Sequence, residues 1–474
     1  VAGAMSVCRA GSRMEVHRHA CSEGSPIRMN RSKSAMQRLT AWILFSFVAC
    51  APIAQATQNV DGLFAGQKLI DVSSSSNDAG KVLRVLPDGR LLMAGTCGTG
   101  SLIYFCATRL SPNGDIDLSF GPDNTGTIKF DRFFGQGFPT SVPLNDMLSL
   151  SDGRILFLGM GTLAMLTADG SMLDTSVAGG TGFMSPALQS YALAEQSDHK
   201  ILVAGIASRN DGSGNYDMAV QRLLPDLSVD TNFGTNGSQS IIFNVGSSSS
   251  LATSIAVQSD GRIVLAGFVA FTGQSGKSVG IGRLLQNGQI DSSFSNGFGS
   301  GWVYQTYNIE NVAFAVRVDQ QGRIVYAGYS ATDTNFNTRR CLINRLLANG
   351  NQDFSFNANQ PLQFFVPVGA NYVSCELVDL APQTDGTILA VGSLLDVYFM
   401  AVRLTPGGTF DSTFGSAGIS YGGFDPSATN AVVRNGAMAI DRGLFIAGAS
   451  TNSDTKFGIA VLTLDRIFAD KFGN

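Results

Sequence analysis

A short turn signal recurs seven times along the chain and constrains its fold more than any other feature. Each copy reads Asp-Gly-Arg or a close variant, and a short apolar run that ends in a small residue and glycine follows it, as in VQSDGRIVLAGF at 257–268. Asp-Gly between alternating apolar runs is a strong hairpin signal, so we predict two-residue type I′ turns in which both central residues have positive φ. The copies begin at Asp88, Asp152, Asp198, Asp260, Gln321, Asp385 and Asp441.

Each copy of the turn belongs to a unit of four short apolar runs. A third run follows the hairpin, such as AVQRL at 219–223, and a fourth follows a glycine-rich bend, such as SIIFNV at 240–245. The middle residues of successive turns lie 64, 46, 62, 61, 64 and 56 positions apart. A four-stranded antiparallel unit cannot bury both of its faces alone, so this repeat predicts the stacked blades of a β-propeller. The alternative, a β-solenoid, has a shorter repeat and parallel strands, which two-residue hairpins do not join.

The two ends of the repeat complement each other. No fourth run follows AVLTL at 460–464 in the last unit, whereas GQKLIDV at 66–72 resembles a fourth strand that has no unit of its own. We expect the strand at 67–72 to pair with the last unit. The sequence therefore predicts an all-β, seven-bladed β-propeller of four-stranded antiparallel blades, closed by an N-terminal strand.

The N-terminal part of the chain has the pattern of a targeting segment. Basic residues precede an apolar run at 39–50, and the segment 29–56 ends in the small-x-small cleavage site Ala54-Gln55-Ala56. We therefore expect a secreted protein, located in the periplasm or at the cell surface, with signal peptide cleavage near Ala56. A lipoprotein signal with a lipidated Cys50 is the alternative.

These patterns divide the chain into three parts. Residues 1–28 are interpreted as an over-extended start, 29–56 as a signal peptide, and 57–474 as a single propeller domain of seven repeats. The mature part has no stretch of ~20 apolar residues, the length of a membrane helix, so we predict no membrane span there. We also expect the mature protein to be a monomer.

The charge of the mature chain argues against nucleic acid as a partner. Without residues 1–56 the chain has 25 basic and 34 acidic residues, a net charge of −9. Only 14% of all residues are charged, compared with ~25% in ordinary domains. A nucleic-acid-binding protein would show a basic patch instead.

The repeat resembles a known family. SIAVQSDGRIVLAG at 254–267 and MAVQRLLPDLSVDTNFGTNG at 218–237 are similar to the delta-60 repeat, a tandem unit of exported bacterial proteins. The resemblance covers nearly the whole mature chain and is most specific in the second, third, fourth and sixth units. It implies a propeller fold and no particular activity.

Five arginine–aspartate pairs recur with a spacing of eight residues. The arginine lies on the third strand and the aspartate in the following bend, so we expect them to meet in a bidentate contact that orders the turn. Because the pairs recur from unit to unit, we interpret them as structural. Calcium binding is the alternative, but each bend supplies one or two acids where calcium needs six to eight oxygens. The pairs are Arg109 with Asp117, Arg222 with Asp230, Arg283 with Asp291, Arg345 with Asp353, and Arg403 with Asp411.

Residues suited to catalysis are scarce. His199 is the only histidine after residue 56 and replaces the glycine of one repeated turn, so we interpret it as a turn residue. A His-rich metal site is excluded, and a Ser-His-Asp triad would have to be built on that turn. The GQSGKS segment at 273–278 lacks the spacing of a phosphate-binding loop. We predict no catalytic residue, no metal and no cofactor.

Four cysteines follow residue 56, and an even number of cysteines in an exported protein suggests disulfides. Of the three ways to pair them, we favour Cys97 with Cys106 and Cys341 with Cys375. Free buried thiols that behave as small apolar residues are the alternative.

The long loops that differ most between units, at 207–217, 269–278 and 330–340, are expected on one face of the propeller. Binding usually occurs on such loops, so we predict an exported binding or surface-interaction module for a cell-surface glycan or protein. The alternative is an extracellular polysaccharide-active enzyme, a glycoside hydrolase or lyase, with two carboxylates within about 10 Å on that face. Aromatic residues and arginines dominate contact energetics, so the predicted ligand contacts are Tyr216, Phe271, Phe336, Arg339 and Arg340.

Overall fold

The structure is a computed structural model. It describes residues 67–72, 78–98, 102–139, 141–244, 246–273, 275–294, 300–334, 338–368, 371–394, 398–422, 430–439, 443–451 and 455–462. The predicted start segment, the signal peptide and Phe336 lie outside the described residues, and their interpretation stays a prediction.

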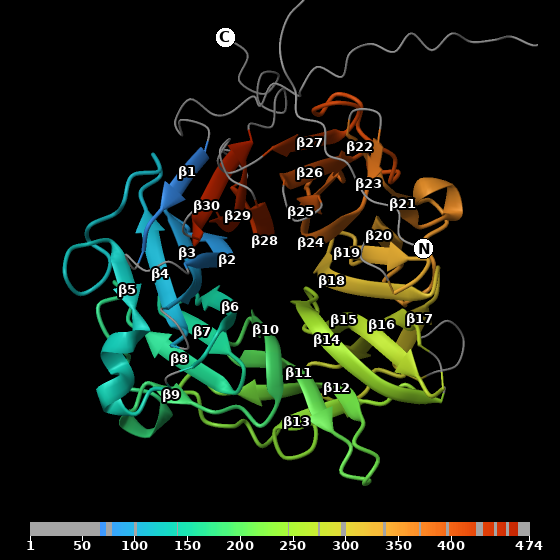
Figure 1. The fold of residues 1–474 in the computed structure, drawn as a ribbon. Coiled ribbons are helices and arrows are strands. Elements are labelled where there is room, and N and C mark those ends of the chain that lie inside the picture. The colour runs from blue at the N-terminus through green and yellow to red at the C-terminus, as the bar shows by residue number, and fades with distance from the viewer. Residues whose placement is uncertain are drawn as a thin grey trace, which may run out of the picture. The chain divides into compact units, whose positions relative to one another are not determined.

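The described chain is built from four-stranded units whose strands follow one another from the centre of a ring to its rim (Figure 1). Each unit is named here by its first strand. The first strands are β2 (Ala79–Val85), β6 (Leu144–Ser149), β10 (Gln189–Glu195), β14 (Ser247–Val257), β18 (Glu310–Val318), β24 (Cys375–Pro382) and β28 (Asn430–Ala439). The second strands are β3 (Leu91–Cys97), β7 (Ile155–Gly159), β11 (Ile201–Ser208), β15 (Ile263–Phe271), β19 (Ile324–Ala331), β25 (Ile388–Leu394) and β29 (Gly443–Thr451).

The outer strands continue the same order. The third strands are β4 (Tyr104–Leu110), β8 (Thr162–Leu166), β12 (Tyr216–Leu223), β16 (Lys277–Leu284), β20 (Arg339–Leu346), β26 (Tyr398–Leu404) and β30 (Thr455–Leu462). The fourth strands are β5 (Thr127–Lys129), β9 (Phe183–Met184), β13 (Ser238–Ile241), β17 (Trp302–Gln305), β21 (Leu362–Phe364), β27 (Ile419–Gly422) and β1 (Gln67–Ile70). The remaining elements are a hairpin of β22 (Val366–Val368) and β23 (Asn371–Val373) and the 3₁₀ helices η1 (Phe130–Gln136), η2 (Ala178–Gly180) and η4 (Asn357–Asn359).

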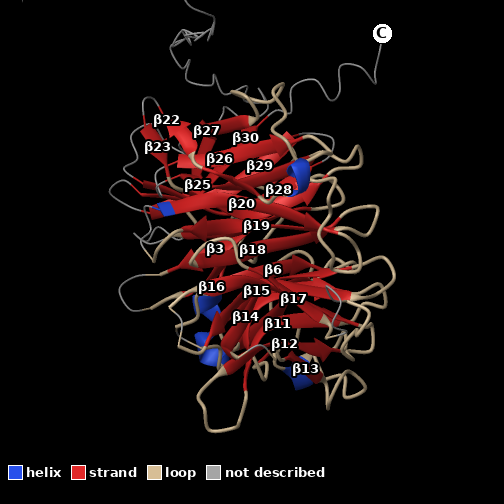
Figure 2. Cartoon of the chain, turned by 90° about the vertical axis from the view of Figure 1, so that its right-hand side faces the viewer, coloured by secondary structure: helices blue, strands red, loops and turns tan. Residues whose placement is uncertain are grey.

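Pairing within the units is antiparallel throughout. Five sheets have four strands, and β14 to β21 form one eight-stranded sheet, in which a single parallel bridge between Lys277 and Glu310 joins β16 to β18. The prediction of an all-β propeller with four-stranded antiparallel blades is confirmed. Figure 2 shows the strands edge on, with loops at both of their ends. Within the described residues, no helix is long and apolar enough to cross a membrane.

The last unit is completed by the N-terminal strand. β1 pairs antiparallel with β30, from Gln67 opposite Ala460 to Ile70 opposite Phe457, and β1 lies beside β30 in Figure 1. Phe457 is buried against the β2 unit, where a Cβ atom on Gly95 would lie 2.7 Å from its ring. The predicted pairing of the strand at 67–72 with the last unit is therefore confirmed, and the first and last units are in contact.

The apolar core lies between neighbouring units rather than within them. One cluster joins Val325 and Ile343 of the β18 unit to Leu377, Ile388 and Val402 of the β24 unit. The other large clusters likewise combine residues of adjacent units. Each sheet thus buries its two faces by stacking, which is the reason the repeat needs its neighbours.

The repeated turns differ from the predicted type I′ turns. In the first of them, the N–H of Gly89 donates to Leu86 O and the N–H of Leu86 donates to Arg90 O, each at 2.8 Å. The loop therefore has three residues, and only its last residue, Gly89, has a positive φ, of 81°. This is a type I turn followed by a left-handed residue. His199 adopts the same conformation at a φ of 64° in its own copy of the turn.

Candidate binding site

Every first strand carries an extra residue opposite its second strand, and β14 has a further register shift between Ser247 and Ser249. In β2, Gly80 pairs with Gly95 and Val82 pairs with Ala94, so that Lys81 is left without a partner in the ladder. The same β-bulge recurs in β6, β10, β14, β18, β24 and β28. The glycine of the repeated small-residue–glycine pair lies against it, because a Cβ atom on Gly95 would lie 2.0 Å from Ala79 O.

In the six first strands from β2 to β24, the bulge changes the direction of one side chain. Side chains of a regular strand point to the two faces of the sheet, which here pack on neighbouring units, whereas a bulge re-aims the extra residue. The extra residues, here called the bulge positions, are Lys81, Asn145, Tyr191, Thr253, Phe314, Val378 and Arg434. The first six of them line one cavity of about 720 Å³. The backbone geometry repeats, but no two of these residues are of the same type.

The cavity occupies the centre of the ring. Among the side chains that the structure describes, its walls come from the first strands β2, β6, β10, β14, β18 and β24, which surround the centre in Figure 1. In each of these six strands the bulge position lies four residues before the last residue of the strand. The bulge positions therefore form one level within the cavity.

The walls at this level differ in polarity from side to side. On the β2 and β6 strands, the Lys81 ammonium donates to Asn145 Oδ1 at 3.2 Å, and Asn145 Nδ2 donates to Ser190 O at 2.8 Å. On the β18 and β24 strands, the cavity is lined by Phe314 and Val378. Figure 1 places these two pairs of strands on different sides of the centre. The site thus has a polar, cationic side and an apolar side.

Two arginine–aspartate bridges connect neighbouring first strands inside the cavity. Arg84 Nη2 lies 2.9 Å from Asp146 Oδ1, and Arg317 Nη2 lies 2.5 Å from Asp379 Oδ1. In both, the arginine lies three residues after one bulge position and the aspartate one residue after the next. Asp146 also accepts the Leu193 N–H at 2.9 Å. The aspartates are therefore held by arginine and by backbone donors.

His199 lies in a small polar cluster at the turns. Ser151 Oγ is 2.6 Å from Glu195 Oε1 and 2.8 Å from His199 Nδ1, and that nitrogen lies 3.3 Å from the same carboxylate oxygen. A catalytic triad needs the hydroxyl and the carboxylate on different ring nitrogens. Both contacts here involve Nδ1, so the cluster joins two turns and is not arranged as a triad.

In each of the five repeated pairs, the arginine contacts its aspartate at the end of the strands where the turns lie. The Nε–Oδ2 distances are 2.7 Å for Arg109–Asp117, 2.9 Å for Arg222–Asp230, 2.8 Å for Arg283–Asp291, 2.6 Å for Arg345–Asp353 and 2.7 Å for Arg403–Asp411. The contact uses one nitrogen, so the predicted bidentate geometry was wrong. The physical reason in four of the five pairs is that another guanidinium nitrogen donates to a backbone carbonyl of the following unit.

Arg345 illustrates where those nitrogens go. Its Nη2 donates to Ser355 Oγ at 3.2 Å, and its Nη1 donates to Pro406 O in the following unit at 2.8 Å. The guanidinium also lies 5.0 Å from the centre of the Phe356 ring. Three other arginines bind a backbone carbonyl of the following unit in the same way, namely Arg109 to Ala168, Arg222 to Gln286 and Arg283 to Ala348. The pairs therefore couple neighbouring units as well as ordering a bend.

The environment of the paired aspartates affects their ionisation. Burial alone would raise the pKa of Asp353, but hydrogen bonds from Ser355 and Arg345 outweigh it and hold the pKa below its usual value. The pKa of Asp291 is lowered in the same way, by Ser293 and Arg283 against the effect of burial. Among the described residues, no group of three His, Cys, Asp or Glu side chains could hold a metal ion.

The predicted loop contacts are spread over three units. Tyr216 begins β12 with 39% of its surface exposed, and Phe271 ends β15 with its ring 5.6 Å from that of Tyr304. Arg339 and Arg340 are neighbours at the start of β20. None of these four residues lines the central cavity.

The two arginines have partners of their own. Arg339 Nη1 lies 2.6 Å from Glu376 Oε2, and its guanidinium lies 4.0 Å from the centre of the Tyr329 ring. The Arg340 guanidinium lies 5.0 Å from the centre of the Phe365 ring. Both contacts join the start of β20 to the chain that leads into the β24 unit, so these arginines have a packing role in the structure.

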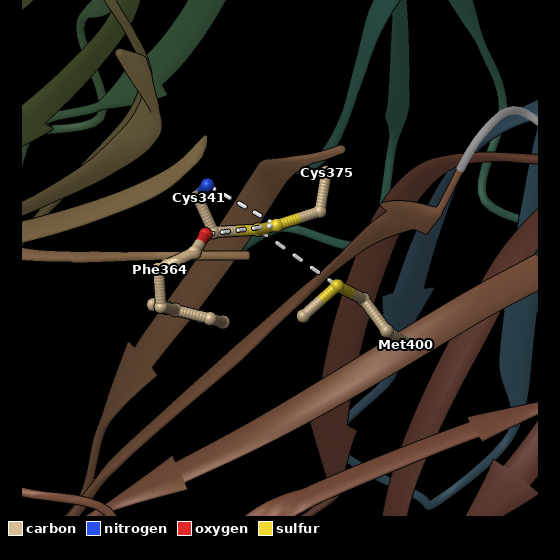
Figure 3. Close-up of a disulfide and its surroundings, with 4 residues drawn as sticks. All are labelled: Cys341, Phe364, Cys375 and Met400. Carbon is tan, nitrogen blue, oxygen red and sulfur yellow. Dashed lines mark hydrogen bonds between the residues drawn. A yellow bond between two sulfur atoms is a disulfide. The ribbon is translucent and has the colours of Figure 1, made fainter. Parts of the chain in front are cut away.

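The four cysteines form two disulfides. Cys97 and Cys106 are joined across the β3–β4 hairpin, and Cys341 of β20 is joined to Cys375 at the start of β24. Figure 3 shows the second disulfide beside Phe364 and Met400; the Met400 sulfur lies 3.8 Å from that of Cys341. This disulfide links two neighbouring units of the ring.

Comparison with known proteins agrees with this architecture. Three segments, 196–233, 258–294 and 383–414, match a family described as a β-propeller domain of unknown function, DUF5122. The matched segments therefore resemble repeats of a β-propeller family. No curated protein matches the sequence.

Solved structures with a similar chain trace share little sequence with this protein. Polysaccharide lyase Uly1 is 12% identical with a TM-score of 0.46, covering 87% of this chain and 96% of its own. A protein of unknown function from Dyadobacter fermentans is 11% identical with a TM-score of 0.39, covering 84% and 98%. Trypanosoma rangeli sialidase in complex with sialic acid is 11% identical with a TM-score of 0.36, covering 84% and 59%. At these TM-scores the likeness carries no statement about activity.

The cavity residues were not among the sequence predictions, although one signal could have located them. A glycine inside a strand marks a bulge or a close backbone approach, and the repeated small-residue–glycine pair lies opposite each bulge, as Ala94 and Gly95 do. Counting back across the hairpin from that glycine leads to the bulge position of the same unit.

Proposed function

We propose that the protein is an exported β-propeller that binds a ligand in its central cavity. One observation carries the proposal: the bulge positions share one backbone geometry, and six different side chains at these positions face one space. Identical side chains would suffice if the bulge served only the fold. Unlike side chains around one space suit an asymmetric ligand, and about 720 Å³ falls in the range of ~300–1,000 Å³ typical of ligand pockets.

We infer that the ring has seven blades. Five four-stranded sheets support this number, together with the eight-stranded sheet, which divides into β14–β17 and β18–β21 at the single bridge between Lys277 and Glu310. The delta-60 assignment of the repeat stays part of this proposal. It rests on the sequence segments at 218–237 and 254–267.

Export is supported by two features. The pattern of residues 29–56 is that of a signal peptide, and two disulfides suit an oxidising compartment. The proposed location is the periplasm or the cell surface.

The contacts of the two aspartates in the cavity favour binding over polysaccharide cleavage. Glycosidic bond cleavage commonly uses two acids, one to donate a proton and one to act as base or nucleophile. In the cavity, Asp146 is engaged by Arg84 and the Leu193 N–H, and Asp379 by Arg317 and the Leu380 N–H. These aspartates serve the contacts between first strands.

The long loops are proposed as the rim of the site. Tyr216 and Phe271 are the loop residues that we propose to reach a bound macromolecule, together with Phe336, Arg339 and Arg340. Aromatic residues and arginines on loops are typical binding anchors. This part of the proposal is separable from the cavity by experiment.

The test compares two variants of the mature chain, residues 57–474, on a glycan array and with cell-surface extracts. One variant combines Tyr191→Ala with Phe314→Ala in the cavity. The other shortens the loops at 209–215, 272–276 and 332–338 to glycine–serine turns and also carries Tyr216→Ala and Phe271→Ala. We expect the cavity variant, still folded by circular dichroism, to lose at least tenfold in affinity. Loss in the loop variant alone would move the site to the loops, and retention in both would refute the proposal.

A further inference from the structure

We propose that the outer edge of the β14 unit holds a second binding site, which takes a neutral polysaccharide chain. The site is a row of three aromatic residues, Phe271, Tyr304 and Trp302, here called the aromatic row. None of the three lines the central cavity, so the inference goes beyond the proposed function and does not depend on it. It follows from the exposure of the row, from the strands that hold it, and from the charge of the segments that form it.

The aromatic row lies along one face of the β14 unit. β17 is the outer strand of this unit and lies at the rim in Figure 1. Trp302 and Tyr304 share one face of β17, because successive side chains of a strand alternate. Their ring centres lie 6.3 Å apart, and the Tyr304 ring lies 5.6 Å from that of Phe271 at the end of β15. Tyr304 is 37% exposed, and the other two residues are half-buried, so the row offers aromatic surface at the rim.

The neighbouring strand and the preceding unit hold the row in place. Tyr304 pairs with Gly280 of β16, and Trp302 pairs with Gly282. Directly paired residues point to the same face of a sheet, so β16 adds no side chain beside the two rings. Phe243, which is fully buried and precedes β14, lies there instead, with its ring centre 5.1 Å from that of Trp302. Phe243 thus supports Trp302 from the preceding unit, while Tyr304 keeps its exposed surface.

The segments that form and support the aromatic row carry no charge. Residues 231–259, 263–276 and 292–309 include no acidic or basic residue, whereas 14% of the whole chain is charged. The charged residues that directly follow the last two segments, Lys277 and Glu310, are paired with each other at 3.5 Å. A charged polymer would give up part of its hydration on such a surface without gaining a counter-charge, which is unfavourable. The row therefore suits a neutral ligand.

Neutral polar groups border the rings. Ser278 of β16 and Thr306, which follows β17, are joined by a hydrogen bond of 2.5 Å between their hydroxyl groups. A sugar ring has an apolar face and hydroxyl groups at its edge, so it can contact an aromatic ring and neutral polar groups together. Exposed apolar surface of this kind marks interaction sites. Because the rings lie in a row rather than in a closed patch, they fit the successive sugars of a chain.

The experiment measures binding of hexasaccharides to the mature chain, residues 57–474, by titration calorimetry. Cellohexaose, xylohexaose and mannohexaose are neutral, hexagalacturonate is anionic, and chitosan hexaose is cationic. We expect at least one neutral sugar to bind more tightly than both charged ones, and salt to leave its affinity unchanged. Tyr304→Ala should weaken this binding about tenfold, as expected for the loss of one aromatic contact.

Three further variants show whether the ring itself is needed. Tyr304→Leu keeps apolar volume for folding and should lose as much affinity as Tyr304→Ala, whereas Tyr304→Phe keeps the ring and should lose less. The matched control is Tyr398→Ala in the β24 unit. Tyr398 is 39% exposed, and its ring centre lies 6.2 Å from that of Tyr421. The control should bind the neutral sugar as the parent does, and circular dichroism verifies that each variant is folded.

The outcomes separate this inference from the proposed function. Failure of all three neutral sugars to bind overturns the inference, and so does binding that Tyr304→Ala and Tyr304→Leu leave unchanged or that Tyr398→Ala weakens equally. If only the cavity variant, Tyr191→Ala with Phe314→Ala, loses the neutral sugar, the ligand lies in the cavity, and the proposed function stands without the aromatic row. If sedimentation shows a dimer that Tyr304→Ala dissociates and no sugar binds, the row is a contact between two copies of the chain and the inference is wrong.

Discussion

The propeller has two sets of repeated features, the turns between the first and second strands and the bulges in the first strands. The turns repeat both residues and backbone, whereas the bulges repeat the backbone alone. At the turns, the residues recur with the backbone, and five units carry an arginine–aspartate pair such as Arg345 and Asp353. At the bulges, only the backbone recurs, and the residues run from lysine to phenylalanine. Repeated side chains therefore serve contacts between successive units. A repeated backbone with unlike side chains marks the place where the units face a common space.

The largest effect is expected from removing a repeated arginine. Arg345→Ala removes the closer of two arginines at Asp353, in a pair whose side chains are 1% and 5% exposed, and leaves only Arg323 at 3.7 Å. Breaking a buried ion pair costs about 3–5 kcal/mol in free energy of unfolding. Denaturation in guanidinium chloride measures the loss.

A matched arginine tests the reason for that loss. Arg403 makes the same pair with Asp411, but its Nη1 has no hydrogen-bond partner among the residues that the structure describes. Arg403→Ala should therefore destabilise the protein less than Arg345→Ala. Equal losses would mean that the contact with the following unit contributes nothing.

A smaller effect is expected from blocking a bulge. Gly328 lies in β19 opposite the bulge of β18, and a Cβ atom there would lie 1.9 Å from Val312 O. Gly328→Ala should cost about 1–3 kcal/mol, as overpacking does, and should weaken ligand binding by displacing Phe314. Gly135→Ala is the control, because its Cβ atom would meet nothing within 4 Å. Stability equal to the parent would show that the bulge does not need the glycine.

Acid should reduce the stability that the repeated arginine–aspartate pairs contribute. The folded-state pKa of Asp353 is lowered, so its contribution to stability is present above the unfolded pKa of about 3.9 and is lost as the pH falls through the folded value. We expect the difference in stability between the parent and Asp353→Asn to shrink between about pH 5 and pH 2, as the carboxylate becomes protonated. Urea denaturation across this range measures it. A difference that stays constant would contradict the role assigned to ionised Asp353.

The smallest effect on stability is expected in the cavity. Val378→Thr changes a half-buried side chain that faces the central space, so the free energy of unfolding should change by no more than about 0.5 kcal/mol. Thermal melting beside Arg345→Ala provides the comparison. A cavity substitution as damaging as the arginine substitution would remove the distinction between the two sets of repeated features.

Much of the fold could be predicted because its signals are local in sequence. The Asp-Gly turns, the eight-residue spacing of Arg345 and Asp353, and the unmatched strand at 67–72 can each be recognised within a short segment. Two predicted details were wrong, the turn type and the bidentate geometry of the arginine contact. A three-residue turn needs only one left-handed residue, and the arginine contact is not bidentate because Pro406 O of the next unit takes one of its nitrogens.

The cavity was not predicted because it is assembled from residues far apart in the chain. Arg84 and Asp146 lie 62 positions apart, and so do Arg317 and Asp379. The direction of a bulge side chain such as Phe314 is set by a local break in register, which the alternation of apolar residues does not reveal. The functional prediction was placed on the long loops instead, because their sequences differ most between units.

Among the described residues, the repeated arginines contact the following unit and not the preceding one. This direction bears on how a ring of this kind could gain a unit. Four of the five arginines contact the following unit, as Arg283 does at Ala348 and Arg345 does at Pro406. A copied unit inserted into the gene would therefore bring both a donor for its successor and an acceptor for its predecessor. The contacts between arginines and backbone carbonyls of neighbouring units would form without further substitutions. The central cavity would gain one first strand, whose bulge position could carry any side chain. Tandem duplication can thus alter the specificity of such a protein without redesigning the joints between its parts.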